Sequence, residues 1–431
     1  MSVYHKKGTQ PKENYDWLLQ KDELTLLDIK EAVKDRFGSF CTAVGIQALM
    51  KLMDRDVEDM AGPKGRHNPN RVAYRHGFQA TTVPMGSQRI AITRPRVRSI
   101  ESDQELPIPS YKVFNNDEQL LEAALNRMLH GLSSRDYRHG IEDYNNIAET
   151  SGRSKSTINR HFIKASAKEA QKILGRRFDD ESISALMIDG IGFGDHTAIV
   201  ALGITSEGRK VVLGLRIGST ENAQVCHDLL TDLIDRGLNY QGGLLAIIDG
   251  AKALRKALKD VFGPKVLIQR CQVHKLRNVL DYLPKYKRAY VKHKLQRAWA
   301  SGSAAAAVRQ LRSLATSLES DYPDAAASLR EGLEETVTIL RLNIPGLLQK
   351  TLGSTNPIES AFSLVAKNIK NVKNWKNGKM VQRWAGAALL DAEYRSNRIA
   401  GYRSMSVLIS EVQRLTLDES AGVVEKESII A

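Results

Sequence analysis

The pattern of apolar and polar positions divides the chain into regions of different predicted secondary structure. Apolar residues recur at near-helical spacing through residues 24–60, and Ala61-Gly62-Pro63 predicts the end of that helix. From Phe78 to Val97 apolar and polar residues alternate around a turn at Pro84-Met85-Gly86-Ser87, which predicts a β-hairpin. Residues 117–180 return to helical spacing.

A series of short apolar segments in the centre of the chain predicts a sheet. The expected strands are 184–189, 197–204, 210–217, 244–248 and 266–269. Helical patterns at 221–236 and 251–262 separate the last three strands. The order β-β-β-α-β-α-β predicts a mixed sheet with helices on its faces, the arrangement of ribonuclease-H-like domains. From His274 to about Leu342 only helices are expected, which predicts an all-helical insertion.

The stretch from Ile147 to Phe162 is a candidate helix-turn-helix. Ala148 fits inside a first helix, Gly152 fits the turn, and Ser154 is placed to cap a second helix whose Ile158 and Phe162 face the core. The outward residues are of the types that contact phosphates and base edges: Arg153, Lys155, Ser156, Asn159 and Arg160. The alternative is a helix pair in an ordinary helical domain.

Charge indicates a polyanionic partner. The 431 residues carry 63 Lys and Arg against 49 Asp and Glu, a net charge of +14. The excess lies in three stretches, +8 in 61–100, +9 in 261–300 and +5 in 351–400, whereas 181–260 carries −2. Three basic stretches around a near-neutral centre favour a nucleic-acid groove over a merely soluble surface. No apolar run is long enough to span a bilayer. Three cysteines and a polar start predict a reducing, cytoplasmic location.

Two of the predicted strands end in the same way. Met187-Ile188-Asp189-Gly190 and Ile247-Ile248-Asp249-Gly250 each place an aspartate after an apolar run, at the sheet edge where ligands bind in open α/β folds. If the strands are neighbours, the two carboxylates meet. The alternative is that each aspartate is a turn residue or a helix cap.

A third carboxylate would complete a site for two metal ions. Glu359 is the candidate, although Asn356-Pro357-Ile358-Glu359 also fits a capping box with Asn356 as the cap. Phosphoryl transfer needs an activated nucleophile and a stabilised leaving oxygen, which two Mg²⁺ ions supply together. Carboxylate oxygens suit Mg²⁺, with Mn²⁺ as a substitute.

Further residues have two interpretations each. Arg94, Arg96 and Arg98 on the hairpin either lie along DNA or protect an edge strand. Lys367, Lys370 and Lys373 are spaced to form one helix stripe that holds DNA. Trp299 and Trp375 either stack on an unpaired base or anchor a helix or loop. The spacing of Cys271 and His274 fits a metal pair, with Cys226 and His227 as the other zinc candidates. The alternative is that Cys271 is buried at a strand end and His274 caps or orients the next helix.

Several of these motifs together resemble the bacterial Mutator-type (MULE-like) DDE transposases of insertion sequences. Besides the two aspartate motifs, they are Gln269-Arg270-Cys271-Gln272-Val273-His274-Lys275-Leu276-Arg277-Asn278-Val279 and Ser354-Thr355-Asn356-Pro357-Ile358-Glu359-Ser360. The basic hairpin, from Tyr74 to Arg98, is similar to the family's N-terminal part. The resemblance implies a ribonuclease-H-like catalytic core in which Asp189, Asp249 and Glu359 are the catalytic residues and ligands of two Mg²⁺ ions. It leaves the role of Cys271 and His274 open.

We therefore expect a transposase that binds terminal inverted repeats, cuts at the transposon ends and joins the 3′-hydroxyl to target DNA. The alternatives are a ribonuclease-H-like nuclease without strand transfer and an inactive DNA-binding regulator. The expected partners are double-stranded DNA and a second copy of the chain, in a homodimer or higher oligomer. The expected regions are helical 1–62, basic hairpin 63–116, helix-turn-helix 117–180, catalytic core 181–273, helical insertion 274–350, the rest of the core with Glu359 at 351–400, and tail 401–431.

Overall fold

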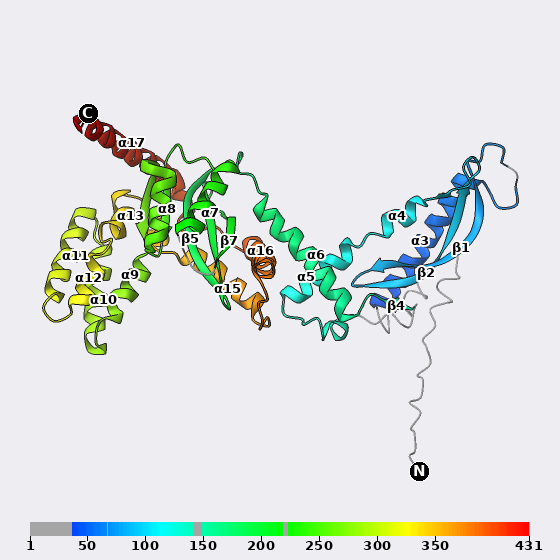
Figure 1. The fold of residues 1–431 in the computed structure, drawn as a ribbon, viewed down its shortest axis with the longest axis horizontal. Coiled ribbons are helices and arrows are strands. Elements are labelled where there is room, and N and C mark those ends of the chain that lie inside the picture. Colours follow the sequence, from blue (N-terminus) through cyan, green and yellow to red (C-terminus); the bar gives the residue numbers. More distant parts are fainter. Residues whose placement is uncertain (1–36, 67, 142–148, 219–222, 431) are drawn as a thin grey trace, which may run out of the picture. The chain divides into compact units, whose positions relative to one another are not determined.

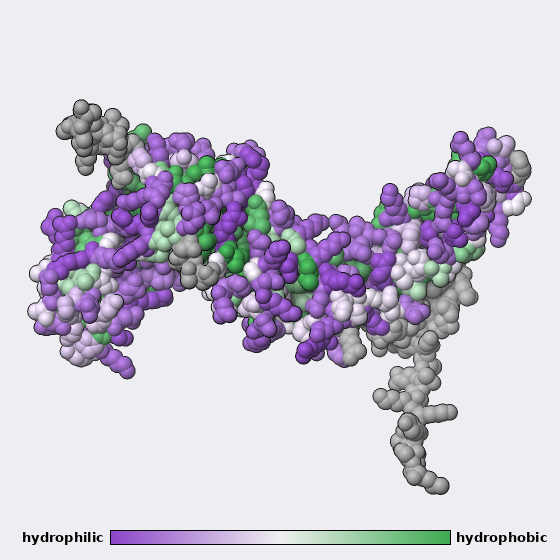
Figure 2. Space-filling view, viewed as in Figure 1, coloured by the Kyte–Doolittle hydropathy of each residue, from purple (hydrophilic) through white to green (hydrophobic). Residues whose placement is uncertain are grey.

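The computed structural model describes residues 37–66, 68–141, 149–218 and 223–430. It divides into two compact units, Met1–Ala165 and Ser166–Ala431, and the boundary falls inside helix α6 (Lys155–Leu174) (Figure 1). None of the helices in these described ranges is long and apolar enough to cross a membrane. The face of the molecule in Figure 2 is mainly hydrophilic, with separate small apolar patches.

The first unit contains one long helix packed on a hairpin. Helix α3 (Phe37–Ala61) ends where the Gly-Pro sequence predicts, and strands β1 (Ala73–Met85) and β2 (Gln88–Ser99) pair antiparallel around a tight turn at Gly86 and Ser87. The helix contributes Leu49, Met53 and Val57 to a core shared with the hairpin. The hairpin prediction is confirmed, because alternation of buried and exposed positions continues along β2. The shorter elements of this unit are β3 (Glu105–Leu106), α4 (Pro109–Phe114), α5 (Glu118–Leu129) and β4 (Thr150–Ser151).

The second helix of the predicted helix-turn-helix is present, but a strand and not a helix leads into the turn. Thr150 and Ser151 form strand β4, which pairs with β2, so the chain reaches Gly152 from a strand and not from a helix. The prediction of a helix up to this turn is wrong because the backbone groups of Glu149 and Thr150 bond to the edge of the hairpin. Ile147 and Ala148 lie outside the described residues.

Helix α6 itself begins as expected. The hydroxyl of Ser154 accepts a hydrogen bond from the backbone N–H of Thr157 at 3.2 Å, and Ile158 and Phe162 are buried. Lys155, Ser156 and Arg160 are exposed, whereas Arg153 and Asn159 are half-buried.

The second unit is built on a five-stranded mixed sheet. Its strands are β5 (Ile183–Phe193), β6 (His196–Thr205), β7 (Lys210–Gly218), β8 (Leu244–Ile248) and β9 (Val266–Arg270). They lie in the order β7-β6-β5-β8-β9, antiparallel among the first three and parallel between β5, β8 and β9. Helices α7 (Ala223–Asp235) and α8 (Lys252–Phe262) pack apolar side chains on this sheet, so the predicted order of elements is observed.

Strand β5 is longer than predicted. It continues past Asp189 to Phe193, and its antiparallel pairing with β6 extends to Phe193 and His196 around a turn at Gly194 and Asp195. The three glycines at 190, 192 and 194 favour a strand that ends at Asp189, because glycine weakens a strand locally. Cross-strand pairing with β6 overrides that weakness.

From Gln272 to Ile430 the described chain forms helices only. Those of the predicted insertion are α9 (Gln272–Asp281), α10 (Lys285–Trp299), α11 (Ala304–Leu318), α12 (Pro323–Arg330), α13 (Thr338–Arg341) and α14 (Gly346–Leu352). They are followed by α15 (Asn356–Ile369), α16 (Gly378–Tyr394) and α17 (Met405–Ile430). The buried ammonium of Lys275 connects α9 to the end of α12, since it donates to the carbonyls of Ser328 at 2.5 Å and Glu331 at 2.6 Å.

Candidate active site

The first two candidate carboxylates emerge from neighbouring strands. Strands β5 and β8 are parallel, and their last paired residues are Ile188 and Ile248. Asp189 and Asp249 each follow directly, and neighbouring strands lie about 4.8 Å apart. The two aspartates therefore start from adjacent positions at the carboxyl end of β8, as the sequence predicts.

Asp249 also shapes the turn that follows it. Its Oδ1 accepts a hydrogen bond from the backbone N–H of Ala251 at 2.8 Å, so the turn interpretation describes one of its two oxygens. Gly250 adopts a φ of +110°, and a Cβ there would overlap Nε of Arg270. The Arg270 guanidinium thus occupies the space beside Gly250 and donates to the carbonyl of Glu331 at 2.9 Å. Arg270 at the end of β9 therefore packs against the turn that follows Asp249 and links this turn to the insertion.

Glu359 lies in the first turn of α15 and does not form the predicted capping box. Helix α15 begins at Asn356, and Thr355 occupies the cap position without a side-chain cap hydrogen bond, while the Ser354 hydroxyl accepts from the backbone N–H of Asn356 at 3.5 Å. Glu359 Oε1 instead accepts a hydrogen bond from the hydroxyl of Thr355 at 2.9 Å. The prediction that Asn356 is the cap is wrong by one residue, because the backbone of Asn356 is already helical. The carboxylate of Glu359 is not used to cap the helix.

Cys271 connects the end of β8 to the start of α15. Its backbone N–H donates to the carbonyl of Ile248 at 2.7 Å, directly before Asp249. Its buried sulfur accepts from the backbone N–H groups of His274 at 3.5 Å and Thr355 at 3.4 Å, and it lies 3.4 Å from the Thr355 hydroxyl. Cys271 is buried directly after the strand as predicted, but the N-cap of α9 is Cys271 and not His274, because the Cys271 sulfur accepts from the His274 backbone N–H. Cys271 thereby links the segments that carry Asp249 and Glu359.

His274 shares an electrostatic environment with two of the carboxylates. Burial alone would raise the pKa of the Cys271 thiol, but hydrogen bonds with His274 and Thr355 outweigh burial and leave it below its ordinary value. The hydrogen bond to Cys271 raises the pKa of His274, and the charges of Asp189 and Glu359 add to that rise against a contribution from burial. Nδ1 of His274 lies 3.9 Å from Oε1 of Glu359. The imidazole therefore lies between the cysteine and the acidic group.

The other candidate zinc ligands, Cys226 and His227, do not lie beside Cys271. Cys226 is buried in the core that α7 shares with the sheet, and His227 is exposed on the same helix, whereas the sulfur of Cys271 contacts α9 and the start of α15. Among the described residues, no three His, Cys, Asp or Glu side chains are placed closely enough to hold a metal ion. The carboxylates of the candidate site are neighbours in the fold without forming a tight cluster.

The three arginines of the hairpin are engaged in ion pairs within the first unit. Arg94 and Arg96 both contact Glu105, at 2.7 and 2.6 Å, and Arg98 contacts Asp103 at 3.2 Å. The hydrogen bond from Arg96 lowers the pKa of Glu105, while burial acts in the opposite direction. These pairs reduce the positive charge that the hairpin presents.

The three lysines after Glu359 do not share one helix. Lys367 lies in α15, but the helix ends at Ile369, so Lys370 is its C-cap and Lys373 lies beyond it. The prediction of a single helical stripe is wrong for Lys373, because the segment around Asn371 and Asn374 has low helix propensity and leads to the Asn377 cap of α16. All three lysines are exposed.

The two tryptophans considered as stacking residues pack inside the protein. Trp375 is half-buried, and its ring meets Phe193 edge-on at a centroid distance of 5.0 Å, at the tip of the β5–β6 hairpin. Trp299 is buried and donates from Nε1 to the hydroxyl of Thr336 at 3.2 Å. The anchoring interpretation therefore describes the contacts of both residues.

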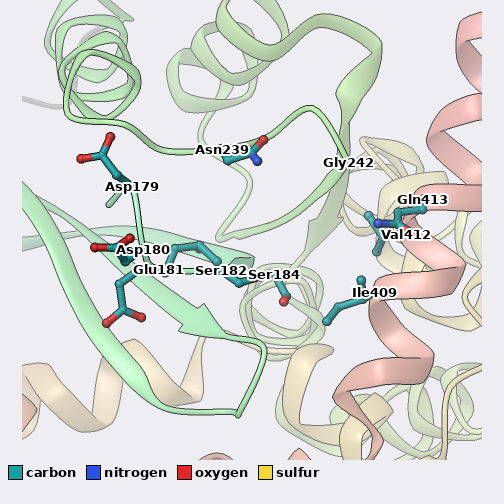
Figure 3. Close-up of a pocket in the computed structure, with 12 residues that line it drawn as sticks. Asp179, Asp180, Glu181, Ser182, Ser184, Asn239, Gly242, Ile409, Val412 and Gln413 are labelled. Carbon is teal, nitrogen blue, oxygen red and sulfur yellow. The ribbon is translucent and has the colours of Figure 1, made fainter. Parts of the chain in front are cut away.

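A separate cavity of about 310 Å³ lies near the opposite end of β5. It is formed by the segment from Asp179 to Ser184, the loop at Asn239–Gly243, and Val412 and Gln413 of α17 (Figure 3). Ile183 and Asp189 are six residues apart on an extended strand, about 20 Å. This cavity is distinct from the acidic site.

Two residues near the carboxylates were not predicted from the sequence: Thr355, which holds Glu359, and Arg270, which packs beside Gly250. Both lie inside the motifs that carry the resemblance, next to the candidate residues. Their contacts cross from β9 to the insertion and to α15, over 61 and 84 residues. The spacing of residues within one motif does not predict contacts between segments that are so far apart in the sequence.

Comparison with known proteins identifies the family. Residues 18–398 match the family described as "Transposase, Mutator family". Similar curated proteins include the transposase for insertion sequence element ISRM5 of Rhizobium meliloti, 27% identical over 72% of this chain and 77% of the relative. The transposase for insertion sequence element IS6120 of Mycolicibacterium smegmatis is 30% identical over 56% of this chain and 74% of the relative. The transposase for insertion sequence element IS256 in transposon Tn4001 of Staphylococcus aureus is 24% identical over 86% of this chain and 94% of the relative. The chain belongs to the Mutator family of transposases.

Proposed function

We propose that the chain is a DDE-type transposase that cuts DNA at the ends of an insertion sequence and joins the freed 3′-hydroxyl to target DNA. The observation that carries this proposal is the connection of three carboxylates through one segment. Asp189 and Asp249 follow paired positions of adjacent parallel strands, and Cys271 bonds both to Ile248 and to Thr355, the residue that holds Glu359. Two strands and one helix, far apart in sequence, thus direct carboxylates to one region.

The order of the central sheet supports a ribonuclease-H-like core. Strands β7, β6 and β5 are antiparallel neighbours, and β8 and β9 extend the sheet in parallel beyond β5. In this arrangement Asp189 belongs to the first strand in sequence and Asp249 follows the fourth, which is adjacent in space. The helices from α9 to α14 then separate Asp249 from Glu359, as the proposed insertion requires.

The chemistry of the donor set fits Mg²⁺. Asp189, Asp249 and Glu359 offer only carboxylate oxygens, the ligands that hard divalent cations take. Within the described residues, Oδ2 of Asp249 and Oε2 of Glu359 have no hydrogen-bond partner, while the other oxygen of each carboxylate is held by a donor of the chain. When bound, two Mg²⁺ ions would lower the barrier to phosphoryl transfer by favouring the nucleophile and the leaving oxygen.

The chain's own residues orient the carboxylates and balance their charge. Thr355 fixes the rotamer of Glu359, and the turn at Gly250 fixes Asp249. His274 lies beside Glu359 and would offset part of the negative charge when protonated. Three carboxylates in one region repel one another, so such positioning contacts are needed to keep them together.

The expected partner is double-stranded DNA, and the expected setting is the bacterial cytoplasm. Exposed residues of α6 and the lysines after Glu359 would contact the DNA backbone. Because two transposon ends must be held together, we expect a homodimer or a higher oligomer on DNA. The alternatives are a nuclease without strand transfer and a DNA-binding regulator without catalysis.

A strand-transfer assay separates these possibilities. Labelled duplexes that carry the element's ends are incubated with the protein, target DNA and Mg²⁺. Wild-type protein should yield cut and joined products, whereas Asp249→Asn and Glu359→Gln should lose both. Asp260→Asn, an exposed position on α8, is the matched control and should retain both activities. Cutting without joining would favour the nuclease, and unchanged activity of Glu359→Gln would refute the assignment of the site.

A further inference from the structure

Helix α10 of the insertion presents an aromatic stripe to solvent. Tyr286, Tyr290, His293 and Arg297 recur every three or four residues, so they lie along one face. Tyr286 is 78% exposed and Tyr290 is 54% exposed. Tyr282, at the end of α9, is also exposed. We call the four residues on α10 the tyrosine face.

The opposite side of α10 is fully used for packing. Val291, Leu295, Ala298 and Trp299 are buried against the rest of the insertion, and they recur at the same helical period. The helix is therefore fixed in its rotation by its own core contacts. The exposed tyrosines contribute little to that core, although large aromatic rings are usually placed where they bury area.

The charged residues of α10 itself have one sign. The fifteen residues of α10 include no Asp or Glu and carry six cationic side chains: Lys285, Lys287, Arg288, Lys292, Lys294 and Arg297. In the part of the chain that the structure describes, none of these six forms an ion pair, in contrast to the paired arginines of the hairpin. Lys287 and Lys294 lie 5.6 and 5.4 Å from the centroid of the Tyr290 ring.

One tyrosine hydroxyl is already oriented. The hydroxyls of Tyr286 and Tyr322 lie 2.8 Å apart, and either one can donate to the other. Because each hydroxyl carries a single proton, only one proton is used within the pair. The second proton remains available to an acceptor from outside, and a phosphate oxygen is such an acceptor.

We propose that the tyrosine face of α10 and its flanking lysines bind the phosphate backbone of duplex DNA. The inference rests on the proposed function and names a surface, away from the carboxylates, that grips the substrate. From Tyr286 to Arg297 the helix rises about 16 Å, at about 1.5 Å per residue. That length equals the rise of about five base pairs along the duplex axis, at about 3.4 Å per step. Cations without carboxylates select a polyanion, and the hydroxyls supply neutral donors between them.

The test uses the full chain and fluorescence anisotropy with a random-sequence duplex of about 30 base pairs and one of its single strands, long enough for several phosphate contacts. Lys287→Gln/Lys294→Gln removes the two charges that lie over the Tyr290 ring. Lys256→Gln/Lys259→Gln removes two charges from exposed positions of α8 and is the matched control. Tyr286→Phe/Tyr290→Phe removes the hydroxyls and keeps the rings. Affinity for each probe is measured between about 0.05 and 0.3 M salt, and thermal melting verifies that each variant is folded.

The Lys287→Gln/Lys294→Gln variant should lower duplex affinity about 25-fold at about 0.15 M salt, because each phosphate that is no longer neutralised weakens binding about five-fold. The log–log salt slope of this variant should also fall by about 1.8. The α8 variant should change affinity less than about two-fold, since its lysines lie outside the proposed surface. The tyrosine variant should weaken binding several-fold with an unchanged slope, because its charge is the same as that of wild type.

Equal losses from the two lysine pairs would overturn the inference, since net charge alone would then explain binding. An unchanged affinity of the tyrosine pair, or losses confined to the single strand, would also overturn it. Failure of the proposed function is a different result: wild-type protein that binds DNA through α10 but neither cuts nor joins the element's ends would leave this surface assigned and the catalytic proposal refuted.

Discussion

The hydroxyl of Thr355 donates to Oε1 of Glu359 at 2.9 Å, and the same hydroxyl lies 3.4 Å from the sulfur of Cys271. Thr355 is fully buried at the cap of α15, so its position is fixed by packing. One side chain therefore relates the proposed third ligand to the segment that begins beside Asp249. This hydrogen bond gives the sharpest test of how the site is held.

Replacing Thr355 by valine keeps the shape of the side chain and removes the hydroxyl. Glu359 then loses the donor that fixes its rotamer, and we expect DNA cleavage to fall about 10- to 100-fold, the usual cost of removing a group that orients a metal ligand. Thr355→Ser restores the hydroxyl and should recover most of the activity. Cleavage rates at several Mg²⁺ concentrations measure the effect, and equal rates for valine and wild type would contradict the role of this hydrogen bond.

Gly250 should not tolerate a side chain. An alanine there would be strained at a φ of +110°, and its Cβ would overlap the Arg270 guanidinium. We expect Gly250→Ala to destabilise the protein by about 1–3 kcal/mol and to lower cleavage further than stability alone explains, because Asp249 precedes the displaced turn. Gly302→Ala is the control, since nothing lies within 4 Å of a Cβ at that position. Thermal melting and cleavage are measured together; matching behaviour of the two variants would refute this expectation.

Lys275 should make stability depend on pH. Burial, together with the charge of Arg270, lowers the pKa of this lysine to about 8, while Glu331 acts in the opposite direction. The unfolded chain, with a lysine pKa of about 10.4, binds more protons than the folded chain between these two pKa values. The free energy of unfolding of wild type should therefore rise with pH across this window relative to Lys275→Met, by at most about 1.4 kcal/mol per pH unit.

Denaturant unfolding at a series of pH values from about 7 to about 10 measures that difference for Lys275. Lys259→Met, at an exposed position, should follow the wild-type curve in parallel. A constant difference between wild type and Lys275→Met over this range would show that the lysine keeps its ordinary pKa in the folded protein.

Trp299 should affect stability and not DNA binding. Its ring is buried and its Nε1 hydrogen bond to Thr336 is internal, so Trp299→Phe loses apolar area and one buried hydrogen bond. We expect a loss of about 1–3 kcal/mol in the free energy of unfolding. Affinity for duplex DNA should stay close to that of wild type. A large loss of affinity in a fully folded variant would restore the stacking interpretation.

The sequence was sufficient for much of the central sheet and for the two aspartates. Leu244–Ile248 is a strand over the residues that its apolar run predicts, and Lys210 begins β7 as expected. These strands are buried by an apolar pattern that is visible along the chain, and parallel strands end at one edge. The positions of Asp189 and Asp249 follow from that edge alone.

Contacts between segments that are distant in the sequence decided features that the pattern of apolar and polar residues did not predict. Asn356-Pro357-Ile358-Glu359 satisfies a capping box by spacing, yet the backbone starts the helix at Asn356 and Thr355 binds the carboxylate of Glu359. Strand β5 passes through Gly190 and Gly192 because β6 pairs with it, and Trp299 is buried because Thr336 and the insertion surround it. The spacing of residues along a helix or strand shows which of them share a face. Hydrogen-bond partners and burial depend on residues that are far apart in the sequence and come together only on folding. The sequence alone therefore determined the strands and the carboxylates they carry, and the tertiary structure decided what holds each carboxylate in place.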